Sequence, residues 1–193
     1  MNKLKLGIAA FLVMSSVQAA FSQASVSLGL KGGLNFANVN TSDPGTAYNS
    51  RTGYHIGAFA NFKFTKLAIQ PELIYSVQGS DVSSATSSGS LDLAYINIPI
   101  LLKLYLIGGL NIQAGPQFGF LASATQGGQD YKSFLKGSDT SIAVGAGLDI
   151  SKFVIDARYN IGMSEINNVA GSSAAKNQVF QLSLGFKFFN FGN

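Results

Sequence analysis

Two groups of side chains in this sequence are of types that could take part in catalysis, and the first is built around His55. It is the single histidine, so a hydrolytic pair of a serine and a histidine base would have to use it. If Thr65-Lys66 forms a two-residue turn, strand pairing sets His55 opposite Ser76. His55 lies on the polar face of its segment, which favours a polar pair in a lumen over a catalytic pair. With one histidine and no cysteine, the sequence also lacks the ligands of a zinc site.

Three carboxylates, Glu72, Asp149 and Asp156, form the second group. Paired carboxylates can serve as a general acid and base. Five basic residues occupy the same kind of position, so we favour ion pairs that neutralise one another inside the protein. The predicted network consists of Lys31, Lys63, Glu72, Lys103, Asp149, Asp156, Arg158 and Lys187. The Gly-x-Gly of GAGLDI at 145–150 has no third glycine and no following helix, so we predict no cofactor.

Strands are the elements that must position these residues. Eight segments alternate between apolar and polar residues with a period of two, the period of side chains along a β-strand. They lie at 25–38, 52–64, 67–78, 91–106, 110–121, 140–150, 153–163 and 177–189. The predicted fold class is all-β, as an eight-stranded antiparallel up-and-down transmembrane β-barrel, because eight is the smallest common strand number for such barrels.

The segment AYINIPILLKLYL at 94–106 shows how the two faces differ. A helix here would carry Pro99 in its interior, at a cost of about 3 kcal/mol. At a period of two, Asn97 and Lys103 share the polar face. The apolar face consists of Ala94, Ile96, Ile98, Ile100, Leu102 and Leu104. Pro99, together with Pro71 and Pro116 on the flanking strands, predicts a bulge or an unpaired ladder position on this side of the wall.

Composition indicates which face points outward. A soluble barrel would show the same alternation turned inside out. Only 11% of the residues are charged and 47% are hydrophobic, whereas soluble domains average about 25% charged residues. A lysine facing lipid at mid-depth would cost about 2 to 4 kcal/mol, and all eight predicted network charges avoid the apolar face. The apolar face is therefore predicted to contact lipid.

Aromatic residues and connection lengths give the barrel a direction. Two predicted interfacial girdles consist of Phe36, Tyr54, Tyr75 and Phe180 at one end, and Phe62, Phe64, Phe153 and Phe188 at the other. Short turns are expected at 65–66, 107–109 and 151–152, and long, mobile, Ser- and Gly-rich loops at 39–51, 79–90, 122–139 and 164–176. Outer-membrane barrels place long loops outside the cell and short turns in the periplasm.

The first residues predict export. MNKLKLGIAAFLVMSSVQA has two lysines, an apolar run and then small residues, as a secretory signal peptide does. The predicted parts are a signal peptide at 1–24, cleaved after Ala19 or Ala24, and a barrel domain at 25–193. Removal of Lys3 and Lys5 leaves 13 − 2 = 11 basic residues against 9 acidic residues. A net charge of +2 gives no reason to expect a nucleic-acid partner.

Five segments together resemble the PorT-type outer-membrane β-barrel family of Gram-negative envelopes. GLKGGLNFANV at 29–39 is similar to the first strand of the family, YINIPILLKLYL at 95–106 to its aromatic-x-x-x-Pro-x-x-x-Lys strand, and AGPQFGFL at 114–121 to its Ala-Gly-Pro strand. DARYNIGMSEI at 156–166 and NQVFQLSLGFKF at 177–188 are similar to its last two strands. The resemblance implies an outer-membrane barrel, and some relatives are implied in protein secretion.

The sequence therefore predicts a multi-pass protein of the bacterial outer membrane that is not an enzyme. We expect a structural or binding role at the cell surface. The expected partners are outer-membrane lipids and lipopolysaccharide, with an extracellular ligand or envelope protein bound through the long loops. The alternatives are a small porin-like passive channel and an accessory component of protein secretion. Eight strands enclose a space that side chains just fill, which favours a blocked lumen over a channel.

Overall fold

The structure is a computed structural model, and strands make up most of the residues that it describes. The described residues are 24–41, 46–84, 87–126, 129–130, 137–163 and 175–192, so the predicted signal peptide lies outside them except for Ala24. The strands are β1 (Ala24–Thr41), β2 (Thr46–Phe64), β3 (Leu67–Ser84), β4 (Ser87–Tyr105), β5 (Leu110–Gln126), β6 (Gln129–Asp130), β7 (Ser138–Ile150), β8 (Phe153–Gly162) and β9 (Ala175–Phe191). Among the described residues, no helix is long and apolar enough to cross a membrane.

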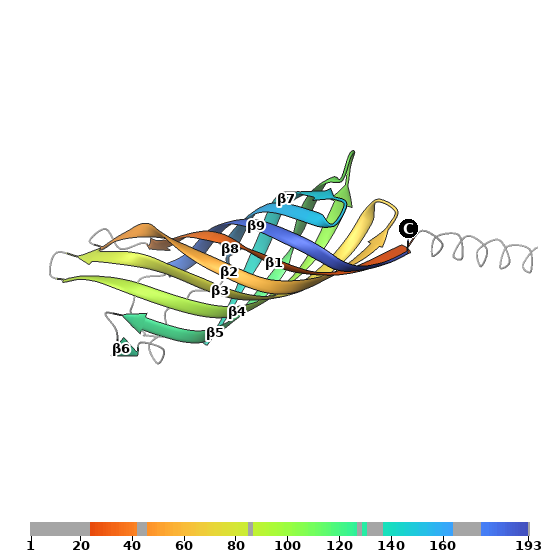
Figure 1. Cartoon of the computed structure of the whole chain (residues 1–193). Helices are drawn as coiled ribbons and strands as arrows, with labels where there is room; N and C mark the ends of the chain where they lie inside the picture. Colours follow the sequence, from red (N-terminus) through yellow and green to blue (C-terminus); the bar gives the residue numbers. More distant parts are fainter. Residues whose placement is uncertain are drawn as a thin grey trace, which may run out of the picture.

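The strands close into a barrel (Figure 1). They pair antiparallel in the order β4-β3-β2-β1-β9-β8-β7-β5, and β4 pairs with β5 to complete the ring. β6 is a two-residue addition to the end of β5. The predicted eight-stranded antiparallel barrel is therefore confirmed. Closure matters in a membrane because hydrocarbon offers no partners for unpaired backbone N–H and C=O groups.

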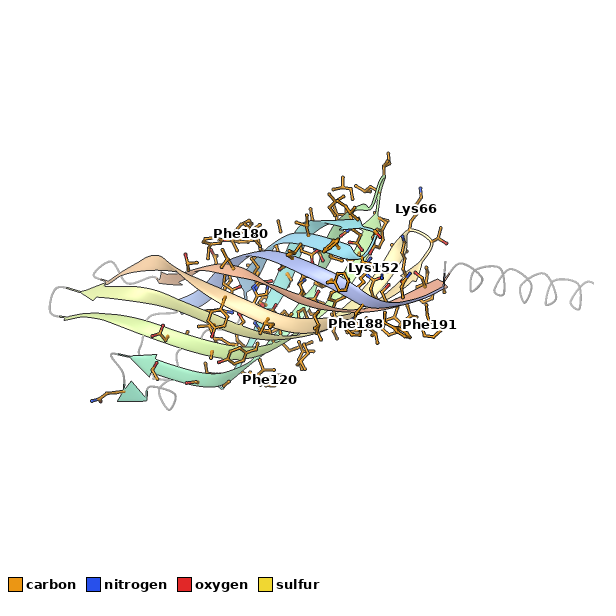
Figure 2. The ribbon with its side chains drawn as sticks, viewed as in Figure 1. Lys66, Phe120, Lys152, Phe180, Phe188 and Phe191 are labelled. Carbon is orange, nitrogen blue, oxygen red and sulfur yellow. The ribbon has the colours of Figure 1, made fainter. Side chains whose placement is uncertain are left out.

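The outer wall is apolar, as predicted. Isoleucine and leucine side chains on the predicted lipid face of β4 are 36% to 54% exposed. The eight predicted girdle aromatics are 38% to 56% exposed. Figure 2 shows Phe120 and Phe180 toward the end of the long hairpins, and Phe188 and Phe191 toward the end of the short turns. The large apolar side chains of the described wall thus face the surroundings of the barrel.

Ala94, on the predicted lipid face, is only 8% exposed, although it keeps its phase in β4 because Leu93 and Tyr95 on either side of it lie inside. Ala94 pairs with Ser123 and Tyr95 pairs with Leu121, so Ala122 is an extra residue in β5. Such a bulge shifts the phase of alternation in β5, where Ala122 and Ser123 are both exposed, and a strict period of two cannot anticipate it. An apolar cluster forms inside the barrel next to this bulge. It consists of Leu93, Tyr95, Leu121 and Ala124, each at most 5% exposed.

Pairing is interrupted beside the prolines. The β3–β4 pairs skip from Pro71 to Ile74, and the β4–β5 pairs skip from Pro99 to Leu102, opposite Pro116. The register is the same on both sides of each interruption. Proline has no N–H to donate to the ladder. These are therefore unpaired ladder positions rather than bulges, which decides between the two expectations from the sequence.

The short turns are confirmed with one small difference. Two-residue turns join β2 to β3 at Thr65-Lys66 and β7 to β8 at Ser151-Lys152. The turn between β4 and β5 spans 106–109, one residue more than predicted. Gly108 and Gly109 adopt positive φ angles of 64° and 86° there, a conformation that glycine tolerates best.

Two of the predicted long loops are wrong. β1 continues to Thr41 and β2 begins at Thr46, while β3 continues to Ser84 and β4 begins at Ser87. Most of 39–51 and 79–90 is therefore paired strand rather than mobile loop. Ser- and Gly-rich segments carry no apolar alternation, so backbone pairing could not be read from them. In 122–139, β5 continues to Gln126, and most of 164–176 lies outside the described residues.

The depth of a residue on the outer wall sets the cost of placing a charge there. We expect Ile98→Arg, at the middle of the apolar face of β4, to lower the free energy of unfolding by about 2 to 4 kcal/mol. Leu67→Arg introduces the same charge at an exposed position beside a short turn and should cost about 0 to 1 kcal/mol. Urea unfolding in phospholipid bilayers measures both values, and equal losses would contradict the membrane placement.

Candidate functional site

A group of buried ions crosses the middle of the barrel interior. Arg158 Nη1 donates to Glu72 Oε2 at 2.7 Å, and Arg158 Nη2 donates to Glu72 Oε1 at 2.6 Å. Arg158 Nη2 also lies 3.1 Å from Asp156 Oδ2. Lys31 Nζ lies 2.7 Å from Asp156 Oδ2 and 3.3 Å from Glu72 Oε1. We call Lys31, Glu72, Asp156 and Arg158 the ionic plug, because their side chains are at most 3% exposed.

The ionic plug joins opposite sides of the wall. β3, which carries Glu72, and β8, which carries Arg158, are four places apart in the ring of eight strands. A bidentate pair between arginine and carboxylate is short, strong and geometrically specific. The Arg158–Glu72 pair therefore spans the lumen at this level.

A second ionic group lies closer to the short turns, around Asp149. Lys187 Nζ is 2.6 Å from Asp149 Oδ2, and the Tyr105 hydroxyl donates to the same oxygen at 2.9 Å. Asn111 Nδ2 donates to Asp149 Oδ1 at 3.2 Å. Lys103 Nζ lies 3.6 Å from Asp149 Oδ1 and 3.6 Å from Asp156 Oδ1, so it links this group to the ionic plug.

Seven of the eight predicted network residues thus make ion pairs with one another, with N–O distances of 2.6 to 3.6 Å. Lys63 lies apart, with its Nζ 4.2 Å from the centre of the Tyr105 ring. Asp156 pairs with Gly147 and Arg158 pairs with Gly145 across β7 and β8, in the register that the two-residue turn at Ser151-Lys152 sets. A Cβ atom at Gly147 would lie 2.5 Å from Asp156 Oδ1, so glycine makes room for the carboxylate.

His55 and Ser76 are opposite each other in the ladder, as the turn at Thr65-Lys66 predicts. The His55 ring, however, bonds elsewhere: Nδ1 lies 2.8 Å from Asn35 Oδ1, and Nε2 lies 2.8 Å from Ser183 Oγ. Asn35 Nδ2 donates to Ser76 Oγ at 2.9 Å. Asn35 therefore bridges the two residues of the expected pair. Local pairing alone could not reveal this, because Ser183 comes from the distant strand β9.

Ser183, His55 and Asn35 have the connectivity of a serine–histidine–asparagine triad. Asn35 Nδ2 donates to the carbonyl oxygens of Tyr54 and Val77, so Asn35 Oδ1 accepts the proton of His55 Nδ1. His55 Nε2 then accepts from the Ser183 hydroxyl. A substrate must reach such a hydroxyl, but Ser183 is 7% exposed and His55 is 3% exposed. The trio acts as a hydrogen-bonded connection between β1, β2 and β9.

The sequence did not reveal which neutral side chains contact the buried ions. Gln70 Nε2 donates to Glu72 Oε1 at 2.6 Å, and Gln113 Nε2 donates to Asp156 Oδ1 at 2.9 Å. Alternation places both glutamines inside, but it does not tell which ion each one contacts. Among the described residues, no three His, Cys, Asp or Glu side chains are grouped to hold a metal ion.

The comparison with known proteins agrees with this architecture. A family model described as "Outer membrane protein beta-barrel domain" matches residues 21–168. The chain belongs to this family. It is thus an outer-membrane β-barrel protein, and its predicted location in the bacterial outer membrane is confirmed. The matched family is a broader class of outer-membrane barrels than the PorT-type family that the sequence resembles, so the match supports the barrel and not the PorT type. No curated protein matches the sequence.

Two solved structures share the fold of this member of the family. Neisserial surface protein A is 16% identical, with a TM-score of 0.59 over 84% of this chain and 99% of that chain. The outer membrane protein OprG from Pseudomonas aeruginosa is 11% identical, with a TM-score of 0.53 over 89% of this chain and 97% of that chain. At such low identity, these likenesses support the barrel architecture alone.

A double-mutant cycle tests the ionic plug. We expect Arg158→Met to lower the free energy of unfolding by about 3 to 5 kcal/mol, because it leaves the buried Glu72 carboxylate short of charge partners. Combining Arg158→Met with Glu72→Gln should cost less than the sum of the two single changes. Urea unfolding in bilayers measures the cycle. Lys152→Met, at an exposed turn, is the control and should change stability by less than about 0.5 kcal/mol; additive losses would argue against the pair.

Proposed function

We propose that this protein is a blocked, non-enzymatic outer-membrane barrel that offers a binding surface on the outside of the cell. The observation that carries the proposal is the Arg158–Glu72 pair across the lumen, at 2.6 and 2.7 Å. A solute could pass this level only if the pair separated. Separation would leave buried charges unpaired, which is strongly unfavourable.

Buried side chains also lie on the far side of the ionic plug, nearer to the long hairpins. The apolar cluster around Tyr95 is at most 5% exposed. The buried trio of His55, Asn35 and Ser183 adjoins this cluster, because Asn35 donates to Ser76 and Ser76 pairs with Tyr95. The ionic plug, the trio and the cluster together support a blocked barrel over the porin-like alternative. The burial of Ser183 likewise supports a non-enzymatic role.

The binding surface is formed by strand ends that extend beyond the apolar wall. We call 37–41, 46–51, 79–84 and 87–91 the crown. Its backbones are paired out to Thr46 opposite Ser84 and to Ser84 opposite Ser87, and Figure 1 shows β2, β3 and β4 projecting together. β7 and β8 have 13 and 10 residues, whereas β2 and β4 have 19. The crown therefore rises higher on one side of the barrel.

A paired crown suits recognition better than free loops would. Ordering of flexible loops opposes binding, and ladder pairing orders these backbones in advance. The sequence NSRTG at 49–53 and the run GSDVSSATSSGS at 79–90 supply hydroxyl, amide and carboxylate groups. We propose a polar partner on this side, such as the sugars of lipopolysaccharide, an extracellular glycan or the polar face of a protein.

The PorT-type assignment and the signal peptide at 1–24 stay predictions. The strand motifs at 95–106 and 114–121 carry the assignment, and the described parts of both are wall strands. A blocked lumen gives no route for a secreted chain. Any part in protein secretion would therefore be an accessory one, with contacts through the crown or the wall.

Electrical recording tests the blocked lumen. In planar lipid bilayers, the unmodified protein should show little or no steady conductance, because the ionic plug leaves no continuous aqueous path. Arg158→Ala should raise the conductance or destabilise the barrel. A large and stable conductance in the unmodified protein, with solute uptake into liposomes, would support the porin-like alternative instead.

Removal of part of the crown tests the binding surface. Gly79 and Asp92 lie opposite each other, so an Asn-Gly turn can join them in place of 80–91. The shortened protein should still insert and show the heat-modifiable migration of a folded barrel. It should no longer capture cell-surface glycans or proteins from isolated outer membranes. Replacing Thr65-Lys66 by Asn-Gly at the opposite end is the control and should leave capture intact. Unchanged capture by the shortened protein would move the binding surface to the wall or the remaining crown.

A further inference from the structure

A polar cavity of about 220 Å³ lies at the short-turn end of the lumen. We call it the vestibule. It lies on the opposite side of the ionic plug from the crown, so nothing in the proposed surface function accounts for it. Its polar lining includes Ser27, Asn61, Lys63, Asp149, Lys187 and Asn190. The mixture of two ammonium groups with hydroxyl and amide groups is of the kind that holds an anion.

The charges of the predicted network do not balance, because five cations accompany three carboxylates. Asp139, a further inward carboxylate, lines a separate pocket beside Tyr95, toward the crown. Asp149 is the carboxylate that lines the vestibule, and both of its oxygens are already engaged. Oδ2 accepts from Lys187 at 2.6 Å and from Tyr105 at 2.9 Å. Oδ1 accepts from Asn111 at 3.2 Å and lies 3.6 Å from Lys103.

The other two network carboxylates are engaged deeper in the lumen. Both oxygens of Glu72 accept from Arg158. Asp156 Oδ2 accepts from Lys31 at 2.7 Å, and Asp156 Oδ1 accepts from Gln113 at 2.9 Å. These contacts leave no oxygen of the three network carboxylates uncommitted for Lys63.

Lys63 therefore carries the unbalanced positive charge at the vestibule. Its Nζ lies 4.2 Å from the centre of the Tyr105 ring. An aromatic face attracts an ammonium group weakly, but it does not cancel the charge. The Tyr105 ring covers one side of the Lys63 ammonium group. The N–H groups of Lys63 can donate toward the cavity that this residue lines.

We propose that the vestibule binds a small oxyanion of the phosphate class. Lys63 supplies the uncompensated charge, and Lys187, with 14% of its side chain exposed, supplies a second ammonium group. Asn190 Oδ1 accepts from Ser27 Oγ at 2.6 Å, which orients the amide so that its N–H groups serve as donors to the anion. Lys66 and Lys152 lie at the same end of the barrel (Figure 2) and add to the positive field that attracts anions.

Titration with inorganic phosphate tests the proposal. The full-length mature protein, folded in a non-ionic, phosphate-free detergent, should bind phosphate saturably in calorimetry, at an ionic strength matched with sodium chloride. Lys63→Gln should weaken binding by about tenfold or more, as expected for one lost charge-assisted hydrogen bond. Lys63→Arg keeps the charge and should retain binding. Lys66→Gln removes the same charge from a turn outside the vestibule and should change the affinity by less than about twofold.

Two results would overturn the proposal: no saturable binding of phosphate above chloride, or an equal loss in Lys66→Gln and Lys63→Gln. Heat-modifiable migration on gels checks that each variant is folded. If Lys63→Gln does not fold, Asn190→Ala replaces it, because Asn190 is exposed at the end of β9; it should weaken binding several-fold, and unchanged affinity would also count against the site.

Nanodiscs of phosphatidylglycerol separate two sources of the phosphate group. If the headgroup of a lipid fills the vestibule, inorganic phosphate should no longer bind to the protein in nanodiscs. If the ligand is a free periplasmic anion, inorganic phosphate should bind in nanodiscs as it does in detergent. Both results are consistent with an oxyanion site, and they differ in where the anion comes from.

Discussion

A sheet in hydrocarbon must pair its backbone N–H and C=O groups within itself, and this sheet does so by joining β4 to β5. Closure with eight strands also fixes the width of the lumen at a value that side chains can span. Arg158 and Glu72 meet for that reason, since the strands that carry them stand on opposite sides of the ring. The buried ion pairs are thus a consequence of closure as well as a support for it.

Small residues decide how such large ions fit. Arg158 and Asp156 pair with Gly145 and Gly147, where a Cβ atom would come within 2.9 Å of the Arg158 backbone or 2.5 Å of the Asp156 carboxylate. The same principle acts on the other side of the lumen, where the ring of Phe59 occupies the space beside Gly29. Close packing of this kind leaves little freedom to exchange one interior ion for another.

Alternation along the sequence was enough to place the strands, the lipid face and the inward charges, because a period of two separates the faces of any strand. It was not enough in β5, where the extra residue Ala122 changes the phase, so that Ala122 and Ser123 are both exposed. It also could not extend strands into 79–90, whose backbones are held by pairing without any apolar pattern. The partners of His55 come from β1 and β9, and such contacts depend on the closed ring rather than on neighbouring turns.

The two ends of the barrel differ in the physical basis of what they can bind. At the crown, paired backbones order polar groups in advance, and neither Lys nor Glu occurs in 79–91. At the short turns, Lys63 and Lys187 lie beside the single carboxylate of Asp149. The surplus charge falls on Lys63 because Asp149 already accepts from Lys187, Tyr105 and Asn111. In the proposed blocked barrel the ionic plug separates the two ends, so each end would select its own partner. Among the described residues, the two ionic groups share one ion-pair partner, Lys103, which lies 3.6 Å from both Asp149 and Asp156. Lys103 would therefore carry any electrostatic influence of a vestibule anion toward the ionic plug.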